Sequence, residues 1–256
     1  MLLRISLVGF ISLFIYACGG TTSNESEETT DSLTTEADTL QQVDELPAVS
    51  VWDNVSVRAS ADKEGKWLTS LSLGESLTFL GEEKTSENDN TYVKVRLNDG
   101  TEGWSRTEFI VPEAEAAVFI NDTDIYDRPD LLTKSERSFS QMDIVAVKQT
   151  KDQWAEVVGK PSDAKWLRSG WVKTNNLSYE DVDIAMAKFA KPVLSMESSE
   201  EKAEKLEEIL NNQDLTASVF TPTIKEALDV IKLNEPVDTD ATSEEVAADT
   251  TTSPIN

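Results

Sequence analysis

Short stretches in which apolar and polar residues alternate predict β-strands in the first half of the chain. Residues 93–97 alternate valine and leucine with lysine and arginine, which is the period of two that a half-buried strand shows. Asn98-Asp99-Gly100 follows as a tight-turn signal, and a second strand is expected around Trp104. Similar patterns occur at 55–58 and 76–80. Short strands at such close spacing predict a small barrel rather than an open sheet.

The same order of signals recurs further along the chain. Residues 144–158 contain two apolar stretches that predict strands. Gly170-Trp171-Val172 then matches Gly103-Trp104-Ser105. Arg128 precedes Trp171 at nearly the spacing at which Arg58 precedes Trp104. A duplicated unit of this length predicts two barrels in tandem.

The pattern changes to a helical period after this second β-rich part. Apolar residues on one face predict a helix over 179–190, which should end before Pro192. Ser199 is expected to cap a second helix over 200–211, and Thr221-Pro222 has the composition of a third helix start. These helices should pack together or cover the second barrel.

The N-terminus reads as a targeting segment. Arg4 precedes an apolar run over 5–16, which suits a signal peptide and is short for a membrane span of ~20 residues. Ile15-Tyr16-Ala17-Cys18-Gly19 resembles the lipobox of bacterial lipoproteins, from which Tyr16 departs because a smaller residue is usual there. The resemblance implies cleavage before Cys18 and lipidation of that residue, with palmitate among the acyl chains, and it implies an outer membrane lipoprotein on the periplasmic face or the cell surface. The alternative is a plain signal peptide or anchor helix with an incidental cysteine.

Acidic segments without basic residues flank the patterned region. Residues 19–46 and 234–256 are rich in Thr, Ser and acidic residues, so they should be a disordered tether and tail. The acidic run at 24–28 is similar to surface-export signals in lipoproteins of the Bacteroidetes group. A solvated spacer explains that run equally well.

Composition narrows the chemistry further. The chain has 48 acidic and 23 basic residues, a formal net charge of −25, one cysteine and no histidine. An acidic surface repels nucleic acid. Nucleophilic machinery that depends on an imidazole and zinc sites that use His and Cys are excluded. We therefore expect no enzyme activity, no cofactor, no metal and no intramolecular disulfide.

Four segments of the first β-rich part resemble the motifs of one family. The family motifs are an NVR strand, a GxxV turn, a WxxV strand and a closing GxxGWV. The matching segments are Val55-Ser56-Val57-Arg58-Ala59, Leu73-Gly74-Glu75-Ser76-Leu77, Tyr92-Val93-Lys94-Val95 and Gly100-Thr101-Glu102-Gly103-Trp104. They are similar to bacterial SH3 (SH3b) domains, although Ala59-Ser60-Ala61 stands where the family usually has Ser-Gly-Pro.

A diverged second copy is expected over about 117–177. Its matching residues include Arg128-Pro129 and Trp154, while Asp127 stands where an apolar residue is expected and 160–168 reads as an insertion in the distal hairpin. The resemblance implies a binding module that recognises cell-wall peptide, glycan or a protein partner. The cysteine peptidase or amidase that often accompanies such modules is excluded by the missing His and Cys.

The expected fold class is mainly β with a C-terminal α part, with two small SH3-like barrels, a short helical segment and disordered acidic tails. The expected divisions are a signal peptide (1–17), the lipidated tether (18–47), SH3b domain 1 (48–113), SH3b domain 2 (114–177), the helical segment (178–233) and the tail (234–256).

Aromatic side chains are the candidate ligand contacts. Trp104, Trp154 and Trp171 occupy repeated positions that predict core filling, and Tyr92 is a further candidate for stacking. Trp52, Tyr126 and Trp166 lie in less regular stretches and are the predicted ligand-binding residues. Asp122, Asp124, Asp127 and Asp130 lack the Gly and terminal Glu of a calcium loop, so they should be turn residues.

Three functions follow from these observations. The first is a lipid-anchored, non-enzymatic binding protein of the cell envelope, whose partners are peptidoglycan or an envelope protein. The second is a hydrolase that uses paired carboxylates in an interdomain cleft. The third is a structural assembly subunit.

Overall fold

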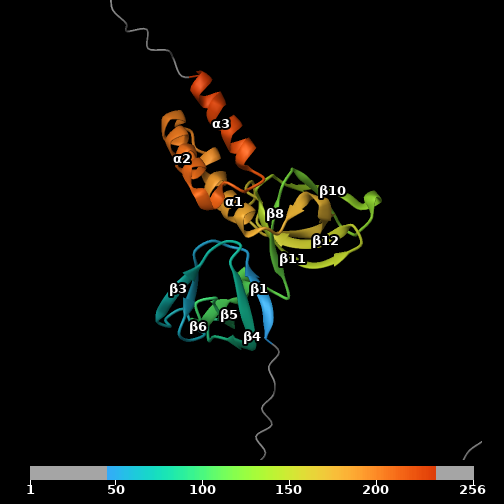
Figure 1. Cartoon of the computed structure of the whole chain (residues 1–256). Coiled ribbons are helices and arrows are strands. Elements are labelled where there is room, and N and C mark those ends of the chain that lie inside the picture. The colour runs from blue at the N-terminus through green and yellow to red at the C-terminus, as the bar shows by residue number, and fades with distance from the viewer. Residues whose placement is uncertain (1–44, 235–256) are drawn as a thin grey trace, which may run out of the picture. The chain divides into compact units, whose positions relative to one another are not determined.

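The computed structural model describes residues 45–234, which fall in one compact unit. The predicted signal peptide, Cys18, nearly all of the tether and the acidic tail lie outside the described residues. The expected fold class is confirmed, because two seven-stranded sheets are followed by three helices (Figure 1). Among the described residues, no helix is long and apolar enough to cross a membrane.

The first sheet forms a small barrel-like domain. Its strands are β1 (Leu46–Ser50), β2 (Val55–Arg58), β3 (Trp67–Leu71), β4 (Ser76–Thr85), β5 (Thr91–Arg96), β6 (Glu102–Arg106) and β7 (Ile110–Pro112). The predicted alternation is borne out in β2, where Val55 and Val57 are buried and share a core with Leu71, Val95 and Ile110. The sequence pattern missed β1, which begins inside the predicted tether.

The second sheet has the same strand order as the first. Its strands are β8 (Glu115–Phe119), β9 (Thr123–Tyr126), β10 (Lys134–Phe139), β11 (Ile144–Lys151), β12 (Trp154–Gly159), β13 (Arg168–Lys173) and β14 (Leu177–Ser178). The two orders are β3-β2-β6-β5-β4-β1-β7 and β10-β9-β13-β12-β11-β8-β14, so each strand of the first sheet has a counterpart seven positions later.

The register corrects one detail of the predicted repeat. Arg58 pairs with Trp104 between β2 and β6, whereas Tyr126, and not Arg128, pairs with Trp171 between β9 and β13. Ile125 is fully buried as Val57 is, so the apolar position of the second strand is filled. Asp127 lies beyond this strand as an exposed residue and pairs with Arg137 at 3.0 Å. The matching Arg at 128 misled the alignment because it follows the strand by two residues.

A glycine marks the close crossing of strands in both sheets. A Cβ on Gly103 would lie 2.6 Å from Val57 Cγ1 and 2.8 Å from the Arg58 carbonyl oxygen. A Cβ on Gly170 would lie 2.4 Å from Ile125 Cγ2 and 3.0 Å from the carbonyl oxygen of Tyr126. In both sheets a glycine therefore allows two neighbouring strands to approach closely.

The C-terminal helices pack together and against the second sheet. They are α1 (Asp181–Leu194), α2 (Ser199–Asn211) and α3 (Thr221–Asn234). Their shared core contains Met186, Leu206 and Ile224 and continues into Val118 and Ile144 of the second sheet.

Two details of the helix ends differ from the sequence-based expectation. Pro192 lies inside the last turn of α1 instead of following the helix, and the helix ends at Leu194. The oxygen of Ser198, not that of Ser199, accepts a hydrogen bond from the Glu201 N–H and caps α2.

A further apolar cluster connects the two sheets. Val49 and Val51 of the first sheet and its following turn are buried with Ala114, Ala116 and Ala146. Ile184 of α1 packs against the same cluster. Residues of both sheets and of α1 therefore share this cluster.

Candidate functional site

The three predicted contact residues are found in different surroundings. Trp52 lies between β1 and β2, half-buried, with its ring centroid 5.6 Å from that of Phe109. Tyr126 ends β9 and packs edge-on against Trp154 at 4.8 Å between centroids. Trp166 is 79% exposed in the connection between β12 and β13, which contains the predicted insertion.

The core expectation for the repeated tryptophans holds for two of them. Trp104 and Trp154 are buried, whereas Trp171 is half-buried. Tyr92, which occupies the place in β5 that Trp154 occupies in β12, is also buried. Its ring edge nevertheless contributes to a groove.

This groove runs along the first sheet and encloses about 360 Å³. We call it the barrel-1 groove. Its aromatic surface comes from Trp52, Tyr92 and Phe109. Its cations are Arg58, Lys63 and Arg106, and Asp53 is its one acidic side chain.

One backbone contact and one ion pair hold the arginines of the barrel-1 groove. Arg58, the last residue of β2, donates from Nη1 to the carbonyl oxygen of Gly65 at 2.8 Å, which ties the loop after β2 to the sheet. Arg106 ends β6, pairs with Glu108 at 3.0 Å and lies 5.7 Å from the Phe109 ring centroid. An aromatic surface edged by fixed guanidinium groups can stack on a planar or sugar face and bind a carboxylate.

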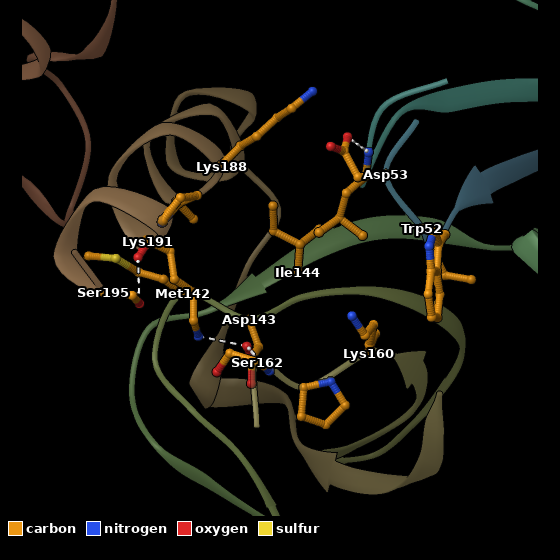
Figure 2. A pocket seen from close by; sticks show the side chains of 15 residues that line it. Trp52, Asp53, Met142, Asp143, Ile144, Lys160, Ser162, Lys188, Lys191 and Ser195 are labelled. Carbon is orange, nitrogen blue, oxygen red and sulfur yellow. Dashed lines mark hydrogen bonds and ion pairs between the residues drawn. The ribbon is translucent and has the colours of Figure 1, made fainter. Parts of the chain in front are cut away.

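A second hollow lies where the two sheets meet α1, and we call it the junction cavity (Figure 2). It encloses about 380 Å³. Trp52 and Asp53 line both this cavity and the barrel-1 groove. Of the predicted contact residues, Trp52 lines these two hollows, whereas Tyr126 and Trp166 line neither of them.

Sequence reasoning missed the lysines of the junction cavity. Lys160 comes from the connection after β12, while Lys188 and Lys191 are three residues apart on α1. A spacing of three puts residues on one helix face. Two lysines on one helix face could have indicated a binding site, because basic residues are few in this acidic chain. The sequence does not show that α1 lies beside the connection after β12.

The two carboxylates of the junction cavity are engaged in holding the structure. Asp143 is 3% exposed and accepts hydrogen bonds from Lys191 Nζ at 2.6 Å and from the backbone N–H groups of Ser140 and Ser162. Asp53 accepts from the backbone N–H of Leu73 at 3.2 Å. Both carboxylates thus fix the backbone that surrounds the cavity.

The clustered aspartates of the second sheet each have a separate partner. Asp124 pairs with Lys134, Asp130 accepts from the backbone N–H of Leu132, and Asp122 accepts from that of Gln141. Among residues 45–234, no three potential metal ligands lie close enough to hold an ion. These aspartates therefore act as turn and surface residues.

Comparisons with known proteins identify one part of the chain. No curated protein matches it. Two solved structures share features with it: NlpC1 from Trichomonas vaginalis (13% identity, TM-score 0.24, 58% of this chain and 53% of that one) and NlpC2 from Trichomonas vaginalis (12% identity, TM-score 0.23, 65% and 56%). The chain thus spans little more than half of either, and similarity at this level carries no functional conclusion. The family model for bacterial SH3 domains matches residues 53–111, which contain β2 to β6 and most of the barrel-1 groove. Residues 53–111 are therefore a bacterial SH3 domain.

Proposed function

We propose that this chain is a non-enzymatic binding protein that attaches to cell-wall material through the barrel-1 groove. The observation that carries the proposal is the aromatic and cationic lining of a groove on a bacterial SH3 domain. Bacterial SH3 domains are binding modules, and wall peptides and glycans offer the carboxylates and sugar faces that this lining suits.

The sequence supports a binding role over a catalytic one. The chain has no histidine, and its one cysteine is Cys18. The hydrolase alternative needs a free pair of carboxylates, whereas Asp53 and Asp143 of the junction cavity are both engaged by backbone donors. An assembly subunit that contacts only envelope proteins is the other alternative, and a wall-binding experiment separates it from our proposal.

The second sheet is proposed to be a diverged second SH3 copy. Its support is the identical strand order and the matching pairs Arg58–Trp104 and Tyr126–Trp171. Tyr126 replaces the arginine that fixes the loop after β2, so this copy lacks one cation of the barrel-1 groove.

The proposal places the binding part on a lipid anchor. The lipobox-like sequence at Cys18 and the acidic segment after it support an outer membrane lipoprotein with a tether. Replacing Cys18 with Ser should move the protein from the membrane fraction to the soluble fraction. A variant that stays in the membrane fraction would overturn the anchor.

Co-sedimentation with purified peptidoglycan sacculi tests wall binding. A fragment that starts at Val49 would cut β1, so the soluble form should comprise residues 19–256 and keep every described residue. Arg106→Gln, which removes a cation of the groove, should reduce the pelleted fraction, while Lys66→Gln removes an exposed cation that does not line it. Failure of the unmodified protein to pellet, together with retention of one envelope protein, would favour the assembly subunit.

A further inference from the structure

The junction cavity combines an apolar lining with three lysines. Trp52, Leu73 and Pro192 are apolar side chains of its lining that keep some exposed surface. Lys160, Lys188 and Lys191 line it from two different elements (Figure 2). Its volume of about 380 Å³ lies at the lower end of the range for small-molecule sites, roughly 300–1,000 Å³. A short ligand with an apolar group and a negative charge matches both features.

The lysines are incompletely satisfied by the protein itself. Lys191 Nζ donates to Asp143 and to the Gln141 carbonyl oxygen at 2.7 Å, and its third donor has no partner among residues 45–234. Lys160 Nζ lies 4.6 Å from the Trp52 ring centroid. Within the same described range, neither Lys160 nor Lys188 has a carboxylate partner.

The lining of the junction cavity has the opposite charge balance to the chain as a whole. The chain carries 48 acidic residues against 23 basic ones, yet the cavity is lined by three lysines and two aspartates, and one aspartate is already bonded to Lys191. With Lys191 paired to Asp143, the lining keeps two further lysines against Asp53, a net charge of +1 that favours an anion.

We propose that the junction cavity binds the terminal carboxylate of a short wall peptide, with the apolar side chain of that peptide against the apolar lining that includes Leu73 and Pro192. The choice of a wall peptide rests on the proposed function, whereas the choice of a carboxylate joined to an apolar group rests on the lining of the cavity. The site is separate from the aromatic surface of the barrel-1 groove except at Trp52 and Asp53, which line both.

Calorimetric titration of residues 19–256 with N-acetyl-D-alanyl-D-alanine and with its C-terminal amide tests the assignment. The acid should bind, and the amide should bind roughly tenfold more weakly or worse because a charged acceptor is lost. Equal binding of acid and amide, or no binding of the acid, would overturn it. Inorganic phosphate that binds as tightly as the peptide acid would overturn the peptide assignment as well.

Matched variants locate the site. Lys188→Gln and Lys160→Gln should each weaken the acid by about tenfold. Lys225→Gln on α3 and Lys165→Gln on the same connection as Lys160 remove exposed lysines that do not line the cavity, and they should leave affinity unchanged. An unchanged affinity in the cavity variants, with unchanged melting temperatures, refutes the site. A protein that pellets with sacculi but does not bind the acid refutes this inference alone, whereas one that binds the acid but not sacculi refutes only the proposed function.

Discussion

Asp183 holds α1 in the position from which Lys188 and Lys191 reach the junction cavity. Its side chain is 1% exposed, and within residues 45–234 no cation pairs with it. Instead its carboxylate accepts from Ser178 Oγ at 2.6 Å, from Ser218 Oγ at 2.8 Å and from the Val219 backbone N–H at 2.8 Å. One side chain thus connects β14, α1 and the turn before α3.

Replacing Asp183 with Ala should destabilise the protein by about 4 kcal/mol. Each hydrogen bond to a charged group contributes roughly 1.5–3 kcal/mol, and a buried donor left without a partner costs roughly 1–3 kcal/mol. The three contributions are not additive, because the Ser218 hydroxyl keeps a bond to the Phe220 N–H and the Ser178 hydroxyl is only partly buried. Asp183→Asn retains one acceptor oxygen and should cost about 1–2 kcal/mol.

Urea unfolding followed by circular dichroism and by tryptophan fluorescence measures this effect. All six tryptophans precede the helices, so fluorescence reports on the sheets while the far-ultraviolet signal includes the helices. In Asp183→Ala the helical signal should be lost at lower urea than the fluorescence signal. A loss of stability below about 1 kcal/mol would refute the role given to these three bonds.

Further predictions concern the first sheet. Gly103→Ala should cost about 2 kcal/mol in urea unfolding because its Cβ would lie 2.6 Å from Val57 Cγ1. A cost below about 0.5 kcal/mol would contradict the packing argument. The Lys94 ammonium lies 2.8 Å from Glu82 and lowers the pKa of that carboxyl from its usual 4.5. The ion pair therefore stabilises the fold fully above the usual pKa, and this stabilisation is lost as the pH falls through the lowered pKa. Glu82→Gln should therefore lower the urea midpoint at neutral pH, and the difference should disappear as the pH falls through the lowered pKa. A difference that does not change with pH would exclude titration of Glu82 as the cause. Trp52→Ala should reduce sacculus binding. Trp67→Ala, which changes a 57% exposed tryptophan of the same sheet, and Trp166→Ala should leave binding unchanged. Loss of binding with Trp166→Ala alone would instead support the sequence-based prediction that Trp166 contacts the ligand.

Local patterns in the sequence were sufficient for several strands and for one tight turn of the first sheet. Alternation marked β2 and β5, and Asn98-Asp99-Gly100 forms the predicted turn with Gly100 at φ of 84°. The first strand was missed because Leu46–Ser50 follows an acidic segment and carries Pro47, which disfavours a central strand.

The candidate site was only partly within reach of the sequence. Trp52 was recognised as an irregularly placed aromatic residue, and it does line a hollow. The junction cavity was not foreseeable, because its lysines come from α1 and from the connection after β12, and only tertiary packing brings them together. Motif spacing also gave one wrong equivalence, because it matched Arg128 to Arg58. The strand pairing of Tyr126 with Trp171 shows that Tyr126 is the equivalent residue.

The most direct test of the central claim is a chemical-shift map. Isotope-labelled residues 19–256 would be titrated with solubilised peptidoglycan fragments while the indole N–H and backbone signals are followed. We predict shifts at the Trp52 indole and along the barrel-1 groove at Arg58, Arg106 and Phe109, with the Trp166 and Tyr126 signals unmoved. Shifts confined to the second sheet, or none at saturating fragment concentration, would contradict wall binding by the bacterial SH3 domain.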